Sequence, residues 1–175
     1  KSIPVCAGMG GGSSDCAAVL LALNRLYQTN LPHEELAALA LSLGADVPFM
    51  LTGGLARAQG IGEDLTFIDL PWEYHCVGVM PRFGVSTKEV FSRFDINNMG
   101  PRPDNSTAIA ALKTHDLLSL KGCMKNVLQP VTQKLYPQLA LIEQQLQKQG
   151  AISSVMSGSG TFIYGLFQDR QAAAI

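Results

Sequence analysis

The hydrophobic positions of this chain follow two periods, and each period predicts a different kind of element. Residues 33–43 carry apolar side chains three and four positions apart, which is typical of one face of an amphipathic helix. Short apolar or β-branched runs bounded by turn residues are typical of strands. The patterns predict helices over 19–26, 33–43, 86–91, 107–113, 117–120 and 127–149, the last broken at Pro137. They predict strands over 3–6, 55–60, 63–70, 74–80, 152–156 and 162–167.

The order of these elements indicates the fold class. Residues 55–60 and 63–70 are predicted to form a hairpin, because Gly60-Ile61-Gly62 supplies a glycine turn between them. Helices and strands alternate without the regular βαβ rhythm of a doubly wound parallel sheet. The pattern therefore indicates an α+β fold in two layers.

The sequence also predicts a domain junction and indicates what lies at the two ends of the chain. Pro71-Trp72-Glu73 is the predicted junction between a first domain, residues 1–72, and a second domain, residues 73–175. Residues 1–4 look like the middle of a strand, and residues 169–175 look like the start of a helix. We therefore expect the natural protein to extend beyond both ends.

A glycine-rich stretch near the N-terminus is the most informative local pattern. Residues 8–12 contain four glycines, and Ser13, Ser14, Asp15 and an apolar helical run follow. A strand, a glycine loop and a helix in this order direct unpaired backbone N–H groups and the positive end of a helix dipole at one point. Such a point attracts phosphate, and glycines let the phosphate approach the backbone. Two alternatives stay open: a flexible Gly–Ser linker, or serines that only cap the helix.

The common phosphate and nucleophile motifs do not fit this stretch. No lysine follows the glycines, which excludes a Walker loop. Ser13 stands where a dinucleotide-binding motif has its third glycine, and Asp15 stands where a nucleophile elbow has a glycine. The stretch thus predicts a phosphate site without saying which kind.

Composition narrows the functional classes. With 175 residues, 47% of them hydrophobic, the chain can bury one good core or two small ones. A net charge of −1 argues against a nucleic acid or an anionic membrane as the main partner. No apolar run approaches the ~18 residues that span a bilayer.

Cysteine and histidine usage adds two expectations. The four cysteines form no C-x-x-C pair, so they are expected to be reduced and mostly buried, as in a cytosolic protein: Cys6, Cys16, Cys76 and Cys123. The three histidines are scattered without metal-ligand spacing, so no structural metal is expected.

Four stretches together resemble one enzyme family. Residues 4–18 resemble the second signature of the GHMP small-molecule kinases, in the form P-x-x-x-G-x-G-G-G-S-S-[DN]-x-A-A. Residues 44–49, 84–87 and 157–162 resemble further stretches of the same family. The resemblance implies a GHMP kinase fold, with a truncated ribosomal-protein-S5-like N-terminal domain, which binds ATP, and a ferredoxin-like C-terminal domain.

The resemblance also implies an activity. It implies transfer of phosphate from ATP, with Mg²⁺, to a hydroxyl of a small metabolite. The three consecutive glycines, Gly10 to Gly12, resemble the form found in members that act on the 2-hydroxyl of a cytidine-diphosphate-linked methylerythritol. A homoserine-type or mevalonate-type kinase is the alternative within the family, and a non-catalytic nucleotide-binding module is the alternative outside it.

The resemblance assigns binding roles residue by residue. The ATP-binding positions that it implies are Pro4, Gly8, Met9, Gly10, Gly11, Gly12, Ser13 and Ser14. The substrate-side positions that it implies are Lys1, Thr87, Phe91, Gly158, Ser159 and Gly160. It further implies that the second glycine turn, residues 157–161, lies against the first glycine loop. On the residues alone, that turn could be an ordinary hairpin loop and Phe91 an ordinary core residue.

Asp46 is the predicted catalytic residue. It lies in an apolar neighbourhood between Gly44 and Pro48, where full solvation is expected to be disfavoured, and a carboxylate can accept the proton of an attacking hydroxyl. The alternative is an N-cap for the short helical turn that follows. In the family, the matching aspartate is catalytic and works beside a lysine of the first signature. That lysine is not among these 175 residues, so the isolated chain is expected to be inactive.

Overall fold

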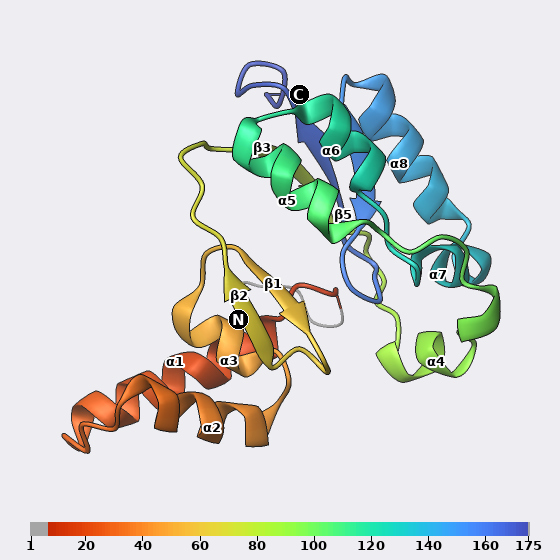
Figure 1. The fold of residues 1–175 in the computed structure, drawn as a ribbon. Coiled ribbons are helices and arrows are strands. Elements are labelled where there is room, and N and C mark those ends of the chain that lie inside the picture. The colour runs from red at the N-terminus through yellow and green to blue at the C-terminus, as the bar shows by residue number, and fades with distance from the viewer. Residues whose placement is uncertain (1–6, 175) are drawn as a thin grey trace. The chain divides into compact units, whose positions relative to one another are not determined.

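The computed structural model describes residues 7–174, which form two compact units (Figure 1). One unit is Gly10–Asp69, and the other combines residues 7–9 with residues 70–174. The predicted strand over 3–6 lies outside the described residues.

The unit Gly10–Asp69 packs three helices and one hairpin (Figure 1). Its elements are α1 (Gly11–Leu26), α2 (His33–Leu43), α3 (Val47–Thr52), β1 (Ala56–Gln59) and β2 (Asp64–Phe67). The helices meet at Ala17, Ala40 and Val47, which are buried, and the small alanines let the helix backbones approach closely. The predicted hairpin is confirmed, because β1 and β2 pair antiparallel up to Gln59 opposite Asp64.

The other unit is built on an antiparallel sheet in the order β3-β5-β4. The strands are β3 (His75–Val79), β4 (Ser153–Met156) and β5 (Ile163–Phe167). Its helical elements are α4 (Thr87–Ser92), η1 (Ile96–Asn98), α5 (Asn105–Thr114), α6 (Leu117–Cys123), α7 (Gln129–Leu135) and α8 (Gln138–Lys148).

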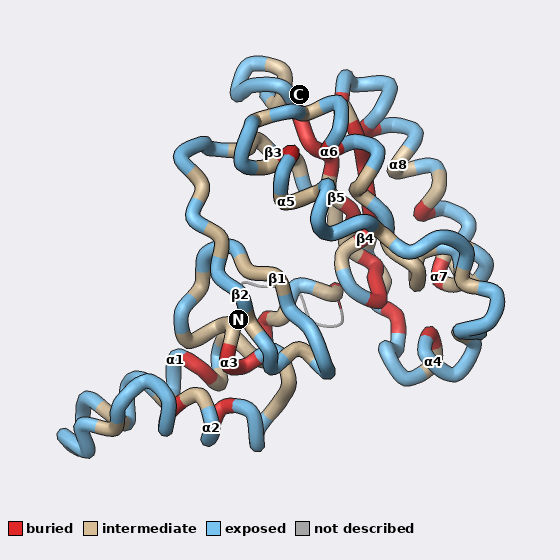
Figure 2. Tube along the Cα trace, viewed as in Figure 1, coloured by how far each residue is buried: buried red, intermediate tan, exposed pale blue. Residues whose placement is uncertain are grey.

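Helices cover both faces of this sheet. Successive strand residues point to opposite faces. Ile163 and Phe167 therefore pack in one cluster with Leu139 of α8, while Leu166 packs with Leu120 of α6. Figure 2 shows the buried residues of this sheet along β4 and β5, whereas β3 has none. The sheet is thus the middle of three layers, so the expected two-layer arrangement is wrong for this unit.

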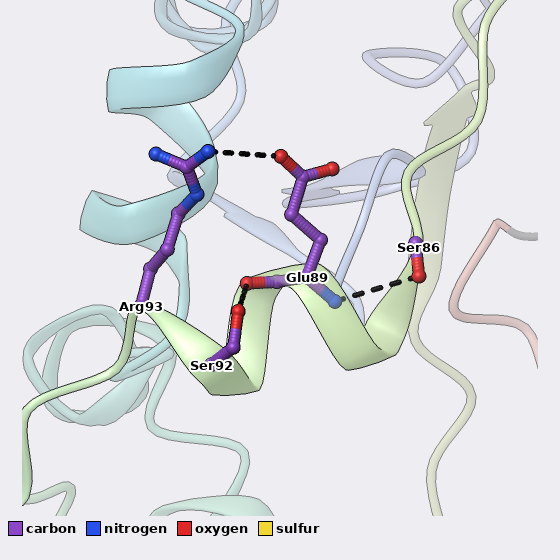
Figure 3. A network of polar contacts seen from close by, with 4 residues as sticks. All are labelled: Ser86, Glu89, Ser92 and Arg93. Carbon is purple, nitrogen blue, oxygen red and sulfur yellow. Dashed lines mark hydrogen bonds and ion pairs between the residues drawn. The ribbon is translucent and has the colours of Figure 1, made fainter.

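Short polar side chains set several helix starts. Ser86 caps α4 by accepting a hydrogen bond from the Glu89 N–H at 3.4 Å (Figure 3). On the same helix, Ser92 Oγ donates to the Glu89 carbonyl at 2.8 Å, and Arg93 Nη2 lies 3.2 Å from Glu89 Oε1. The ion pair is exposed and contributes little stability, so the cap is what fixes the start of α4.

Aspartates cap α5 and α6 in the same way. Asp104 accepts hydrogen bonds from the N–H groups of Ser106 and Thr107, and Asp116 from those of Leu118 and Ser119. The hydroxyls of Thr107 and Ser119 also donate to these carboxylates. Hydrogen bonds from these side chains and backbones lower the pKa of both aspartates.

The expectation of mostly buried cysteines is wrong. Cys16 and Cys123 are half-buried, Cys76 is exposed, and all three are free thiols. Cys6 lies outside the described residues. Within residues 7–174, no helix is long and apolar enough to cross a membrane.

Candidate active site

The first glycine loop leads directly into α1. Gly8 and Gly10 have positive φ angles of 73° and 60°, and α1 begins at Gly11, well before the predicted start at residue 19. The linker alternative is therefore wrong, because Gly11 and Gly12 are helical. The capping alternative is also wrong, because Ser13 and Ser14 lie inside the helix, whose N-cap is Gly10.

The first turn of α1 presents its backbone N–H groups without a protein cap. The first helical hydrogen bond runs from the Ser14 N–H to the Gly10 carbonyl at 2.9 Å, which leaves the earlier N–H groups without acceptors inside the helix. Among the described residues, no side chain caps this end, and its first turn holds no acidic residue. The geometry suits an anion.

Gly12 is the glycine in this turn that the protein interior does not require. Its φ is not in the left-handed region, and among residues 7–174 a Cβ built on it would meet no heavy atom within 4 Å outside its own helical turn. A helical glycine costs about 1 kcal/mol of stability relative to alanine. Its place here makes sense if a ligand occupies the space that a side chain would fill.

Asp46 occupies the N-cap position of α3 but does not act as a cap. Among the described residues, its carboxylate accepts no capping hydrogen bond, although Pro48 stands in the first turn as predicted. Asp46 is exposed, whereas the adjacent Val47 and Pro48 are buried. The expected restriction of its solvation is therefore wrong. The carboxylate is accessible and not engaged by the helix that it precedes.

The second glycine turn contacts the first glycine loop at Gly8. Ser157 Oγ donates to the Gly8 carbonyl at 2.8 Å, and the Phe162 N–H donates to the Ala7 carbonyl at 3.2 Å. A Cβ built on Gly158 would lie 3.3 Å from the Gly8 Cα. The turn is thus more than a hairpin loop between β4 and β5, because it holds the residues that precede α1.

Thr87 and Phe91 lie on α4, four residues apart. The Thr87 hydroxyl is 2.8 Å from the Ser159 hydroxyl, which joins α4 to the second glycine turn. Phe91 is 56% exposed, while the neighbouring Val90 is fully buried. Within the described chain, the core alternative for Phe91 is therefore wrong, and its ring is available to a ligand.

Two polar residues of this unit were missed by the sequence reasoning. Asn126 Nδ2 donates to the carbonyls of Met156 and Gly158, both at 2.7 Å. Thr132, which is fully buried, donates to the Ser159 carbonyl at 3.1 Å. Neither residue stands in a motif, and their partners lie 27 to 32 residues away, so no local pattern could have indicated them.

The predicted site residues divide between the two units. Gly10 to Ser14 and Asp46 belong to one, and Gly8, Met9, Thr87, Phe91 and residues 158–160 belong to the other. Lys1 and Pro4 lie outside the described residues.

Comparison with known proteins gives a consistent result along the chain. Residues 1–54 match the GHMP kinases N terminal domain, and residues 108–175 match the GHMP kinases C terminal domain. A 4-diphosphocytidyl-2-C-methyl-D-erythritol kinase of Clostridioides difficile is 45% identical over 176 residues, covering 100% of this chain and 60% of that protein. The enzyme of the same name from Clostridium novyi is 43% identical over 99% of this chain and 62% of its own length.

Solved structures agree on the fold. A crystal structure of 4-(cytidine 5'-diphospho)-2C-methyl-D-erythritol kinase superposes with a TM-score of 0.81 at 36% identity, covering 99% of this chain and 62% of that one. A homoserine kinase from Cytophaga hutchinsonii superposes with a TM-score of 0.83 at 20% identity, over 99% of this chain and 60% of that one. The chain thus spans about 60% of the length of the relatives it matches. With an α+β fold, and with the N-terminal and C-terminal GHMP kinase domains matched over residues 1–54 and 108–175, the chain belongs to the GHMP kinase family.

Proposed function

We propose that the protein to which this chain belongs is an ATP-dependent kinase of 4-diphosphocytidyl-2-C-methyl-D-erythritol, acting on its 2-hydroxyl in the non-mevalonate isoprenoid pathway. The observation that carries the proposal is the uncapped first turn of α1, with open space at Gly12. Relatives named for this activity, 40% to 45% identical to the chain, supply the choice of substrate.

The first glycine loop would bind the triphosphate of ATP. Backbone N–H groups of Gly11, Gly12 and Ser13 have no acceptor within the helix, and they suit phosphate oxygens. The hydroxyls of Ser13 and Ser14 are oxygen ligands of the kind that Mg²⁺ accepts, so this turn fits the metal as well as the nucleotide. Mg²⁺ would neutralise phosphate charge when bound.

Asp46 would handle the acceptor hydroxyl. In the transfer, the hydroxyl oxygen forms a bond to the γ-phosphorus, the bond from that phosphorus to the bridging oxygen breaks, and ADP leaves. The hydroxyl proton must be taken up, and an exposed carboxylate without a capping partner can accept it. Thr87 and Phe91 would bind the cytidine end of the substrate, with the ring of Phe91 stacking on the base.

The test is ADP release by the complete gene product, measured with three acceptors in parallel. The proposal predicts turnover with 4-diphosphocytidyl-2-C-methyl-D-erythritol and none with homoserine or mevalonate. Turnover with either of the other acceptors would assign a different kinase of the family. ATP binding without turnover on any acceptor would indicate a non-catalytic module. The 175-residue chain alone is expected to be inactive, because the lysine of the family's first signature is not among its residues.

A further inference from the structure

We propose that Asn126 is a positioning residue, which fixes the second glycine turn so that the Ser159 N–H is presented to a phosphate oxygen. The proposal rests on the function proposed above and adds a residue to the same site. It follows from the way that one side-chain amide holds two backbone carbonyls, one at the end of β4 and one in this turn.

The Asn126 side chain is held by three hydrogen bonds. Its Nδ2 donates to the carbonyls of Met156 and Gly158, each at 2.7 Å, which uses both amide protons. Its Oδ1 accepts from the Leu128 N–H at 2.9 Å. These partners fix which end of the amide is oxygen and which is nitrogen. The side chain is therefore a rigid clamp on the turn.

The clamp sets the direction of one N–H group. The peptide between Gly158 and Ser159 is trans, so the Ser159 N–H points away from the Gly158 carbonyl that Asn126 holds. The peptide between Ser159 and Gly160 is held as well, because its carbonyl, that of Ser159, accepts a hydrogen bond from the Thr132 hydroxyl at 3.1 Å. Gly158 supplies the positive φ of 56° that the turn requires. Both peptide planes that flank Ser159 are fixed in this way.

The Ser159 N–H has no acceptor among residues 7–174. Two nearby N–H groups are used, since Ser157 donates to the Phe162 carbonyl at 2.9 Å and Gly160 to the Ser157 carbonyl at 3.0 Å, while Gly158 is exposed and open to water. Ser159 itself is only 7% exposed. Backbone N–H groups with so little access to water are nearly always paired. An oriented donor without a protein acceptor is well suited to an anionic oxygen.

The expected ligand atom is a phosphate oxygen. Two molecules of the proposed reaction could supply it: ATP through its γ-phosphate, and the cytidyl substrate through its diphosphate. A preoriented donor lowers the barrier most when it faces charge that develops in the transition state. Loss of the clamp should then reduce kcat more than it weakens the binding of either substrate.

The kinetic test uses Asn126→Asp and Asn126→Ala in the complete gene product. Asp has the size of Asn but replaces the two amide protons with an oxygen that repels the carbonyls. Asn126 also borders a cavity of ≈ 520 Å³, so water can enter the space that Ala leaves. The control is Tyr74→Phe, which removes a hydrogen bond of 2.6 Å to the Leu112 carbonyl, away from the turn.

Both Asn126 variants should lower kcat roughly 10- to 100-fold, somewhat less than the loss of an oxyanion donor itself. The KM for both substrates should change by no more than about a factor of two, since ground-state binding is largely kept. The control should lose a similar amount of Tm and keep its kcat. If the Asn126 variants have the kcat of the control, Asn126 is only structural and the proposal is overturned.

A spectroscopic arm identifies the source of the oxygen and does not depend on turnover. The ¹H–¹⁵N signal of Ser159 is followed during addition of a non-hydrolysable ATP analogue, and separately of cytidine diphosphate. A downfield shift in the wild type that is lost in Asn126→Asp supports the proposal, and the ligand that causes it is the source. No shift with either ligand overturns it. If the wild type fails to phosphorylate the cytidyl substrate, the proposed function falls, and this arm alone decides the role of Asn126.

Discussion

Gly8 and Ser157 are in direct contact although 149 residues separate them in the sequence. The Ser157 hydroxyl donates to the Gly8 carbonyl at 2.8 Å, and a Cβ on Gly8 would overlap the Ser157 carbonyl oxygen. Glycine at position 8 is therefore required twice, by the positive φ of 73° and by the close approach of the second turn.

Gly8→Ala should destabilise the protein more than the same change at a matched glycine. Gly100 has the same φ of 73°, but a Cβ there would meet nothing within 4 Å. Gly100→Ala should cost about 1–2 kcal/mol of unfolding free energy from the left-handed backbone alone. Gly8→Ala should cost about 1–3 kcal/mol more, through overpacking. Urea unfolding of both variants measures the difference, and equal losses would show that the contact with Ser157 is not tight.

Gly12→Ala should stabilise the fold and weaken ATP binding. The stability gain should be about 0.5–1 kcal/mol, from the higher helix propensity of alanine. The new methyl group would occupy the space next to the first-turn N–H groups, and affinity for ATP should fall roughly tenfold, or about 1.4 kcal/mol. Calorimetric titration with ATP and urea unfolding measure the two effects.

The matched control for this variant is Gly122→Ala. Gly122 is also helical, in α6, and a Cβ there also meets nothing within 4 Å. This change should stabilise the fold and leave ATP binding as it is. Unchanged ATP affinity in Gly12→Ala would mean that the first turn of α1 does not face the nucleotide.

Asp46→Asn should abolish most of the activity without affecting stability. The Asp46 carboxylate makes no capping hydrogen bond among the described residues, so its charge is not needed by α3. Loss of a general base typically lowers the rate about 10²- to 10⁴-fold. The comparison is Asp104→Ala, which removes a cap that accepts from two N–H groups and should lower Tm while kcat is kept. A lowered Tm with near-normal kcat in Asp46→Asn would contradict the catalytic role.

Phe91→Ala should raise the KM for the cytidyl substrate and leave the KM for ATP nearly unchanged. Stacking of a base on an aromatic ring contributes about 1–3 kcal/mol, so the rise should be roughly tenfold or more. Stability should change little, because the ring is 56% exposed. Val90→Ala, at a fully buried neighbour, should instead cost about 2 kcal/mol of stability. Equal damage to both KM values by Phe91→Ala would indicate a structural role.

Acid should destabilise α5 and α6 through their caps. Hydrogen bonds from Thr107 and Ser119 lower the pKa of Asp104 and Asp116 below the ordinary value. Their stabilisation is therefore fully present above the unfolded pKa of about 3.9 and is lost as the pH falls through the lower folded values. The double variant Asp104→Asn and Asp116→Asn retains capping groups that do not titrate in this range. Its unfolding free energy should depend less on pH below 4 than that of the wild type.

Local patterns predicted the parts of the fold that local forces determine. The helix over 33–43 was predicted with its observed bounds, because its apolar spacing is regular and Gly44 follows it. The break at Pro137 separates α7 from α8, since proline cannot continue a helix. The start of α1 was missed by eight residues, since glycines are poor helix formers and packing overrode that preference at the buried Gly11.

The candidate site was predictable where the residues form a motif and not where they meet through the fold. The contact of Gly8 with Ser157 joins two motif stretches that the sequence shows. The position of Phe91 was indicated only by the family resemblance, because the residues alone left open an ordinary core phenylalanine. Asn126 lies in an ordinary apolar segment, and its partners are 30 and 32 residues away. Hydrogen bonds between residues so far apart in the sequence depend on how β4 and α7 pack in the fold. The spacing of residues along the sequence does not specify that packing.

The bonds from Ser157 to Gly8 and from Phe162 to Ala7 also have a consequence for biosynthesis. The ribosome makes the residues that precede α1 long before the turn that holds them, because 149 residues separate Gly8 from Ser157. A nascent chain that has emerged only as far as Gly150 can form α1, α2 and α3 from local contacts. It still lacks Ser157, whose hydroxyl donates to the Gly8 carbonyl. The nucleotide loop would then take its final shape only after the β4–β5 hairpin is released, so the proposed ATP site would mature well after the loop itself has left the ribosome.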